Sequence, residues 1–248
     1  MAFQIRTLLI IGSTSDIGTA IAAQYLKQKV AIILAARQTS SLMAQQNSLI
    51  KKYPEGTIHS MPFDGCDVDS HQTFYDSLNP KPDGVITVMG YLGEQKVSEL
   101  SFKETHKVID SNYTGNVSIL NIIANDFEKR GHGFICGVSS VAADRGRKSN
   151  YIYGSAKAGF TAYLSGLRNR LYHANVHVLT VHPGFVATKM TQHMTLPRRL
   201  TATPEQVAIA IFNAQHSKKN MLYVKSIWKY MMWMIKFIPE VVFKRLNI

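Results

Sequence analysis

The chain has 248 residues, of which 46% are hydrophobic and 18% charged, a balance that is typical of a folded globular domain and excludes disordered, collagen-like and coiled-coil chains. Its two cysteines, Cys66 and Cys136, lie far apart in the sequence, which argues against a disulfide framework or a cysteine-based zinc site. The formal net charge is +12, and residues 218–248 carry half of it, with seven basic residues against one glutamate.

Short β-rich segments alternate with helix-length segments along most of the chain. Several of the short segments are apolar throughout, which is typical of strands covered on both faces of a parallel sheet. Strands are predicted at residues 7–11, 30–35, 57–61, 84–89, 133–138 and 176–181, and helices at 16–27, 40–52, 70–77, 102–129, 150–172 and 204–214. This alternation predicts an α/β fold with one doubly wound parallel sheet.

No linker or repeat interrupts the pattern, so we expect one domain made of residues 1–217 and a C-terminal extension of the same domain at 218–248. The first residues lack the separate apolar region and cleavage site of a signal peptide. The longest uncharged run of the extension, residues 230–235, is far shorter than the roughly 20 residues that span a bilayer. With so few cysteines, a reducing, cytoplasmic location is expected.

A turn of small residues joins the first predicted strand to the first predicted helix. Backbone N–H groups in such a turn can approach phosphate oxygens, and the helix N-terminus beyond adds partial positive charge. An ordinary Ser/Gly turn with Asp16 as the helix N-cap is the alternative interpretation. The candidate nucleotide-binding residues of this turn are Gly12, Ser13, Thr14, Ser15, Asp16, Ile17 and Gly18.

Arg37 follows the second predicted strand, where the adenosine ribose of a dinucleotide would lie. A guanidinium there suits a 2′-phosphate, and no carboxylate is offered to a 2′-hydroxyl, so NADP(H) is favoured while NAD(H) stays possible. A solvated loop charge is the alternative for Arg37. Asp64, just after the third strand, is a candidate to accept a hydrogen bond from adenine, or Asp64 and Gly65 simply form a turn.

Tyr153 and Lys157 are four residues apart on a predicted helix and therefore share one face. A nearby cation stabilises phenolate and lowers the pKa of a tyrosine toward neutrality, which makes this pair a candidate general acid. Taken alone, the spacing is common by chance on helix surfaces. Ser140 at the end of the fifth strand and Asn112 in the preceding helix complete a candidate site at the carboxyl edge of the sheet.

In order and spacing, these residues resemble the short-chain dehydrogenase/reductase family over roughly residues 5–215. The resemblance implies a Rossmann-type dinucleotide-binding fold in which Tyr153 protonates a carbonyl as NAD(P)H delivers hydride. It also implies that Lys157 binds the nicotinamide ribose, that Ser140 binds the substrate oxygen and that Asn112 anchors a relay water. Five further residues would lie against the nicotinamide end: Gly90, Pro183, Gly184, Val186 and Thr188. A homo-oligomer is expected from the same resemblance.

The chain departs from the family pattern at three places. Ile11 replaces the usual Thr, Asp16 replaces the usual second glycine, and Thr87-Val88-Met89-Gly90 stands where Asn-Asn-Ala-Gly is usual. With the C-terminal extension, these departures are similar to the branch of decaprenylphosphoryl 2-keto-ribose reductases, which reduce a keto group on a pentose carried by a polyprenyl phosphate.

Residues 225–238 predict a basic amphipathic helix that ends before Pro239. Lysines at 225, 229 and 236 share a stripe, and both tryptophans of the chain, Trp228 and Trp233, lie among the apolar residues. Such a helix suits the surface of an anionic membrane, and peripheral contact with the inner face of the cell membrane is one interpretation. The alternative is that the helix packs over the substrate cleft or in a subunit interface. Nucleic acid is not expected as a partner, because the charge is interleaved with bulky apolar groups.

The loop before Tyr153 carries Arg145, Arg147 and Lys148, which either meet a substrate phosphate or are solvated. No metal site is expected, since His173 and His177 straddle a helix-to-strand turn without an acidic partner. The sequence therefore predicts an NAD(P)H-dependent carbonyl reductase acting on a lipid-linked keto sugar. The alternatives are a reductase of a keto lipid or other hydrophobic ketone, and a non-catalytic nucleotide-binding scaffold.

Overall fold

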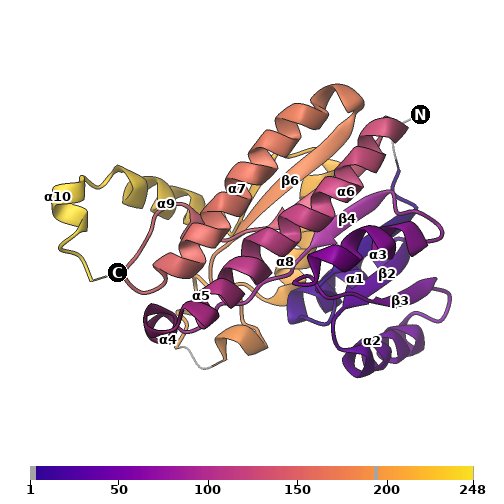
Figure 1. Ribbon diagram of the computed structural model, residues 1–248, viewed down its shortest axis with the longest axis horizontal. Coiled ribbons are helices and arrows are strands. Elements are labelled where there is room, and N and C mark those ends of the chain that lie inside the picture. The colour runs from indigo at the N-terminus through magenta and orange to yellow at the C-terminus, as the bar shows by residue number, and fades with distance from the viewer. Residues whose placement is uncertain (1–3, 193–194, 248) are drawn as a thin grey trace.

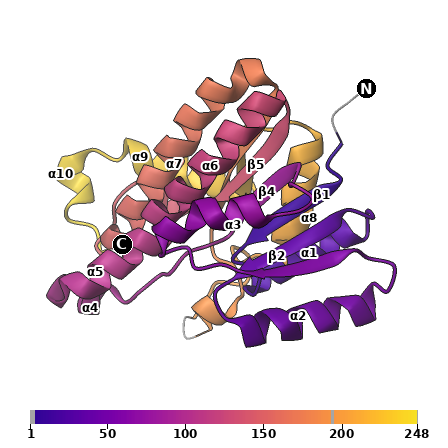
Figure 2. The same ribbon diagram turned by 45° about the vertical axis from the view of Figure 1, so that its right-hand side comes forward.

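The computed structural model describes residues 4–192 and 195–247. Within these ranges the strands form one parallel sheet of seven, in the order β3-β2-β1-β4-β5-β6-β7 (Figures 1 and 2). The strands are β1 (Thr7–Ile11), β2 (Ala31–Ala36), β3 (Ile58–Pro62), β4 (Gly84–Thr87), β5 (Gly133–Val138), β6 (Val176–Pro183) and β7 (Met221–Val224). The predicted doubly wound parallel sheet is confirmed.

Helices cover both faces of this sheet because successive residues of a strand point to opposite faces. In β1, Leu8 and Ile10 pack in one core cluster, and Leu9 and Ile11 pack in the other. Helices α1 (Asp16–Leu26), α2 (Thr39–Lys52) and α8 (Pro204–His216) contribute to the first cluster; α3 (His71–Ser77), α6 (Gly115–Arg130) and α7 (Tyr151–Leu171) contribute to the second.

The prediction of one continuous helix at residues 102–129 is wrong, because the structure interrupts it. The segment divides into α5 (Phe102–Ile109), a π turn at Asp110–Thr114 and α6. A short helix that the sequence did not suggest, α4 (Gln95–Leu100), precedes it. Single π turns inside helices are frequent at functional sites, and this one contains Asn112.

The C-terminal extension adds one strand to the sheet and two helices outside it. Strand β7, which the sequence did not predict, pairs in parallel with β6 at the sheet edge. Helix α9 (Ile227–Phe237) ends before Pro239 as expected, and α10 (Glu240–Phe243) follows. In Figure 1 these two helices project from the side of the molecule opposite β2 and β3. None of the helices in the described ranges is long and apolar enough to cross a membrane.

The sheet order reverses between β1 and β4, whose helical connections lie on opposite faces. In open α/β sheets this switch point leaves a crevice outside the carboxyl ends of the strands, where ligands bind. The turn after β1, the segment after β4, Ser140 after β5 and Pro183 at the end of β6 all lie along this edge. The fold therefore gathers most of the candidate site residues at one edge.

Candidate active site

In the turn after β1, backbone segments lie so close together that side chains do not fit between them. Gly12 has φ +79°, a conformation that L side chains rarely adopt, and a Cβ at Gly18 would lie 2.6 Å from the Ser13 carbonyl oxygen. The Ser15 hydroxyl accepts a hydrogen bond from Gly18 N at 3.0 Å, so Ser15 is the N-cap of α1, not Asp16 as one interpretation of the sequence held. Both glycines are thus required by the turn.

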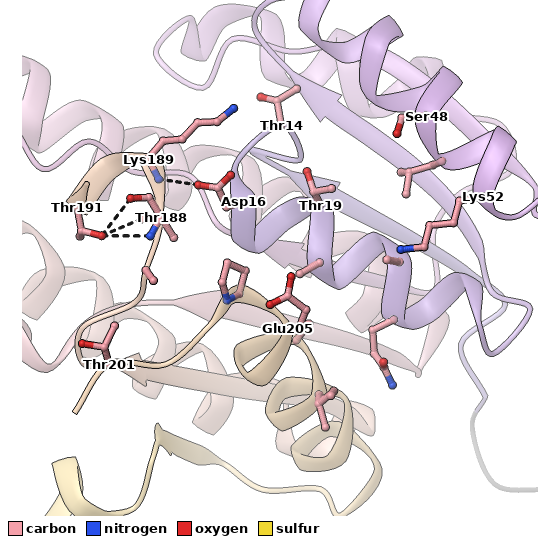
Figure 3. Close-up of a pocket in the computed structure, with 18 of the residues that line it drawn as sticks. Thr14, Asp16, Thr19, Ser48, Lys52, Thr188, Lys189, Thr191, Thr201 and Glu205 are labelled. Atoms are coloured by element: carbon pink, nitrogen blue, oxygen red, sulfur yellow. Dashed lines mark hydrogen bonds between the residues drawn. The ribbon is translucent and has the colours of Figure 1, made fainter. Parts of the chain in front are cut away.

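Asp16 stands where the family usually has a glycine, and it bonds across to another segment. Its Oδ2 accepts a hydrogen bond of 2.7 Å from the backbone N of Lys189, and Figure 3 shows this bond beside Thr188. The carboxylate is thereby held toward the segment that follows β6. A cavity of about 1010 Å³ extends from here between α1, α2 and α8, and it contains none of the four candidate catalytic residues.

Those four residues line a different cavity of about 440 Å³ at the carboxyl edge of the sheet. Ile17, Gly90, Pro183, Gly184, Val186 and Thr188 line it as well. Arg37 and Asp64 do not line it. Arg37 is exposed at the end of β2, and the Asp64 carboxylate accepts a hydrogen bond of 3.0 Å from Cys66 N in a local turn. The catalytic candidates and the nicotinamide-end candidates therefore converge, while the two adenosine-end candidates lie apart.

Asn112 is fully buried in the π turn. Its Nδ2 donates to the carbonyl oxygens of Tyr91 at 2.6 Å and Val108 at 2.8 Å, which fixes the orientation of the amide. Its Oδ1 has no hydrogen-bond partner among the described residues. A buried amide oxygen without a protein partner is an acceptor available to a water or a ligand in the cavity.

Gly90 lies between Asn112 and Lys157. A Cβ at this position would approach Asn112 Oδ1 to 2.6 Å and Lys157 Nζ to 3.3 Å. Lys157 itself is 3% exposed and donates to the Val138 carbonyl oxygen at 3.0 Å. The bare backbone at residue 90 therefore keeps both polar groups open to the cavity.

Tyr153 lies in the first turn of α7, and Lys157 Nζ lies 5.9 Å from the centre of its ring. Burial raises the pKa of Tyr153 to about 12, and a hydrogen bond with the Ser140 side chain opposes this rise. Burial also lowers the pKa of Lys157 to about 7. The sequence-based expectation of a lowered Tyr153 pKa is wrong for the chain alone, because burial outweighs the opposing hydrogen bond with Ser140.

Ser140 is positioned by the end of β5. Its hydroxyl oxygen accepts a hydrogen bond of 3.1 Å from Ala142 N and caps the short turn Val141–Ala143. The Ser140 carbonyl oxygen lies 3.2 Å from Nδ1 of the buried His182. The serine is therefore held on both sides while its hydroxyl stays next to Tyr153.

Gln95, Phe185 and Trp228 also line the cavity, although none of them was a candidate site residue from the sequence. Gln95 Oε1 accepts a hydrogen bond of 3.3 Å from Ile152 N at the start of α7, and Phe185 contacts Trp228 edge to face at 5.3 Å. Trp228 also packs on Gly184, where a Cβ would lie 2.0 Å from the indole ring. The aromatic composition of residues 227–237 was the sequence signal for Trp228, and no local motif points to Gln95.

Helix α9 contributes Trp228 to the wall of this cavity, in line with the interpretation that the extension packs over the substrate cleft. Trp228 and Met232 are buried against Val141, and Trp228 Nε1 donates to the Leu200 carbonyl oxygen at 3.0 Å. The opposite face is exposed, with Trp233 63% exposed. No group of three His, Cys, Asp or Glu side chains suited to hold a metal occurs in the described part of the chain.

The chain is similar to known proteins in both sequence and fold. The profile described as short chain dehydrogenase matches residues 6–198. The chain is similar to an uncharacterized oxidoreductase of Mycobacterium tuberculosis, with 32% identity over 242 residues and 96% of each chain covered. An uncharacterized oxidoreductase of Streptomyces coelicolor is 34% identical over 250 residues, covering 97% of this chain and 96% of that one. A solved short-chain dehydrogenase from Sphingobium yanoikuyae in complex with NADPH has a similar fold, with TM-score 0.80, 18% identity, and 94% and 96% of the two chains covered.

Proposed function

The chain belongs to the short-chain dehydrogenase family of NAD(P)-dependent oxidoreductases, and from this premise we propose that it reduces a ketone to an alcohol with NADPH, Tyr153 being the proton donor. The observation that carries the proposal is the convergence of Asn112, Ser140, Tyr153 and Lys157 in one cavity beside Gly90 and Pro183. Their roles are those that the family resemblance implies. A scaffold without activity has no need for this convergence.

The residues at the crevice fit a dinucleotide. The turn at Gly12 and Gly18 leaves no room for side chains, and the N-terminus of α1 presents backbone N–H groups to an anion. The free Oδ1 of Asn112 and the amine of Lys157 are polar groups that the nicotinamide ribose and its surrounding water would satisfy. When bound, the reduced nicotinamide supplies the hydride.

Tyr153 holds the proton for this reduction. With a pKa of about 12, its phenol is protonated at neutral pH and is therefore ready to act as an acid toward a carbonyl oxygen. The Ser140 hydroxyl, next to the phenol, would position that oxygen by a second hydrogen bond. Because Lys157 has a pKa of about 7, it gains a positive charge as the pH falls toward neutrality, and this charge favours departure of the Tyr153 proton.

NADPH is the cofactor that the adenosine end favours. Arg37 is exposed at the carboxyl end of β2, the position from which short-chain dehydrogenases reach the adenosine ribose. A guanidinium binds a 2′-phosphate through charge-assisted hydrogen bonds. The Sphingobium yanoikuyae dehydrogenase of similar fold was solved with NADPH.

We propose a keto sugar carried on a lipid phosphate as the substrate, in line with the resemblance to decaprenylphosphoryl 2-keto-ribose reductases. The cavity joins polar groups around Tyr153 to apolar ones at Phe185, Trp228 and Leu92. A sugar with an attached lipid has the same combination of surfaces. A keto lipid is the second candidate, since the apolar wall alone would accommodate it.

The exposed face of α9 and α10 supports peripheral contact with an anionic membrane. Its apolar side chains include Tyr230, Trp233, Met234, Phe237, Val241 and Val242. Lys229, Lys244 and Arg245 are exposed around them, and the acid in this segment, Glu240, pairs with Arg145 at 2.9 Å. An aromatic face with a basic rim binds the interface of anionic bilayers.

A substrate panel tests the proposed function. NADPH oxidation is measured with a keto-pentose on polyprenyl phosphate, the same keto-pentose without lipid, and aliphatic ketones of matched chain length. We expect the highest kcat/KM with the lipid-linked sugar. Equal kcat/KM for the sugar with and without lipid would overturn the lipid-linked assignment, and no oxidation with any ketone would overturn the reductase assignment.

Liposome sedimentation tests the membrane contact. Replacing Trp233 and Phe237 by serine removes two exposed apolar rings whose centres lie 5.1 Å apart. It leaves the buried Trp228 in place. The wild-type chain should sediment with phosphatidylglycerol vesicles and the double variant should stay in the supernatant. Equal sedimentation of both proteins would refute the contact.

A further inference from the structure

The loop between Ser140 and Tyr153 carries three cationic side chains, Arg145, Arg147 and Lys148, and their contacts differ. Arg145 donates to the carbonyl oxygens of Ile235 and Ile238 at 2.6 Å each, and its guanidinium stacks 3.6 Å above the Phe243 ring. Lys148 donates to Asn247 Oδ1 at 3.3 Å. Both residues hold the C-terminal extension and are therefore engaged by the protein itself.

Arg147, between them, is the cation of this loop that lines the active-site cavity with Ser140 and Tyr153. Its Nε is buried and has no acceptor, and within the described ranges its guanidinium enters no ion pair or hydrogen bond. Burial lowers the pKa of Arg147, and the charge of Asp144 opposes this effect in part. The cavity thus contains a partly desolvated guanidinium without a direct anionic partner.

The acids near Arg147 do not supply that partner. Asp144 accepts hydrogen bonds from Tyr223 at 3.1 Å on both carboxylate oxygens and lies 3.7 Å from Lys236 Nζ. Glu94 lines the same cavity but is exposed, and it forms no ion pair with Arg147 in the part of the chain that the structure describes. An unpaired, partly buried cation is costly, so a persistent one favours binding of an anion.

Asn150 adds a second unsatisfied group on the same wall. It is the N-cap residue of α7, but its side chain makes no capping hydrogen bond, and its Oδ1 is buried without a partner among the described residues. It lines the cavity together with Arg147. The loop therefore presents a fork of N–H donors and a separate acceptor to one ligand.

We propose that Arg147 binds an oxyanion of the ketone substrate, a phosphate or carboxylate, and that Asn150 accepts a hydrogen bond from a neighbouring hydroxyl of the same molecule. This deepens the proposed function and rests on it. A planar guanidinium matches two oxygens of such a group in parallel hydrogen bonds, which gives orientation as well as affinity. Arg147 is accordingly a specificity residue, and it separates charged from neutral ketones.

Pairs of ketones that differ mainly in charge test this role at saturating NADPH. Dihydroxyacetone phosphate is compared with dihydroxyacetone, and acetoacetate with methyl acetoacetate. In the wild-type enzyme we expect higher kcat/KM for the charged member of at least one pair, and the pair concerned tells phosphate from carboxylate. Arg147→Met should lower kcat/KM for the charged ketone by roughly 10- to 100-fold and change the neutral one less than about threefold.

Two controls make the result specific. Lys148→Met removes a cation of the same loop outside the cavity and should leave the charged-to-neutral ratio unchanged. Arg147→Lys keeps the charge but removes the fork, so it should restore part of the preference. If Arg147→Met and the wild-type enzyme show the same charged-to-neutral ratio, the proposal is wrong.

A binding measurement separates this proposal from the proposed function. The melting temperature of the NADPH complex is measured with each charged and neutral probe. A rise with a charged probe that disappears in Arg147→Met supports the anion site even when no ketone is turned over, in which case the reductase assignment alone fails. Turnover of ketones without any charge dependence on Arg147 retains the reductase and refutes the anion site.

Discussion

Trp228 connects the C-terminal extension to the active site, and its removal should destabilise the whole domain. The side chain is 4% exposed and packs on Val141, Phe185 and the bare backbone of Gly184. Truncating a buried tryptophan to alanine costs about 3–5 kcal/mol. The lost hydrogen bond to the Leu200 carbonyl oxygen adds about 1 kcal/mol. Trp228→Ala should therefore lower the free energy of unfolding by about 4–6 kcal/mol.

Urea unfolding followed by far-UV circular dichroism measures this change. Trp233→Ala is the matched control, because it removes the same side chain from the exposed face of the same helix and should cost no more than about 0.5 kcal/mol. If residues 218–248 belong to the same domain as 1–217, Trp228→Ala shifts one cooperative transition to lower urea. Equal free energies of unfolding for the two variants would refute the packing of α9 against the catalytic segment.

Further predictions concern the cofactor and the proton donor. Arg37→Ser should raise KM for NADPH roughly tenfold in steady-state assays and leave KM for NADH nearly unchanged; an equal effect on both cofactors would exclude a 2′-phosphate contact. Gly90→Ala places a Cβ 2.6 Å from Asn112 Oδ1 and should lower kcat by at least about tenfold, whereas unchanged kcat would show that Asn112 is not needed there. In the folded chain the pKa of Lys157 is about 7, below its ordinary value of 10.5. Between pH 7 and pH 10.5 the unfolded chain therefore binds more protons at this residue than the folded chain does. Without cofactor, the stability of the wild-type chain relative to Lys157→Met should therefore rise from about pH 7 to pH 9.5 in urea titrations, and a flat difference would contradict the lowered pKa.

The fold was accessible from the sequence because its signals are local. Short β-rich runs, several of them apolar throughout, predicted six of the strands, and small residues predicted the turn at Gly12. Strand β7 was not predicted, because its four residues lie directly before the amphipathic helix and form a strand only through their pairing with β6. The π turn at Asn112 was not predicted either, because the sequence pattern around it is that of a continuous helix.

The candidate site was predictable where the order and spacing of its residues resemble the family pattern, and it was unpredictable where contacts between distant residues decide. The interval between Tyr153 and Lys157 places both on one face of a helix, and the structure brings Ser140 and Asn112 to them. The sequence did not distinguish Arg145 from Arg147, because the difference lies in carbonyl groups about 90 residues away. Burial, which raises the pKa of Tyr153, is likewise a property of the packed chain.

The most direct test of the central claim is the single-turnover rate of NADPH oxidation by Tyr153→Phe, measured beside its Kd for NADPH. The substitution keeps the ring and removes the proton that is to reach the carbonyl oxygen. The rate should fall by about 100- to 10,000-fold, while the Kd for NADPH stays within about twofold. A rate close to that of the wild-type enzyme would contradict the assignment of Tyr153 as the proton donor.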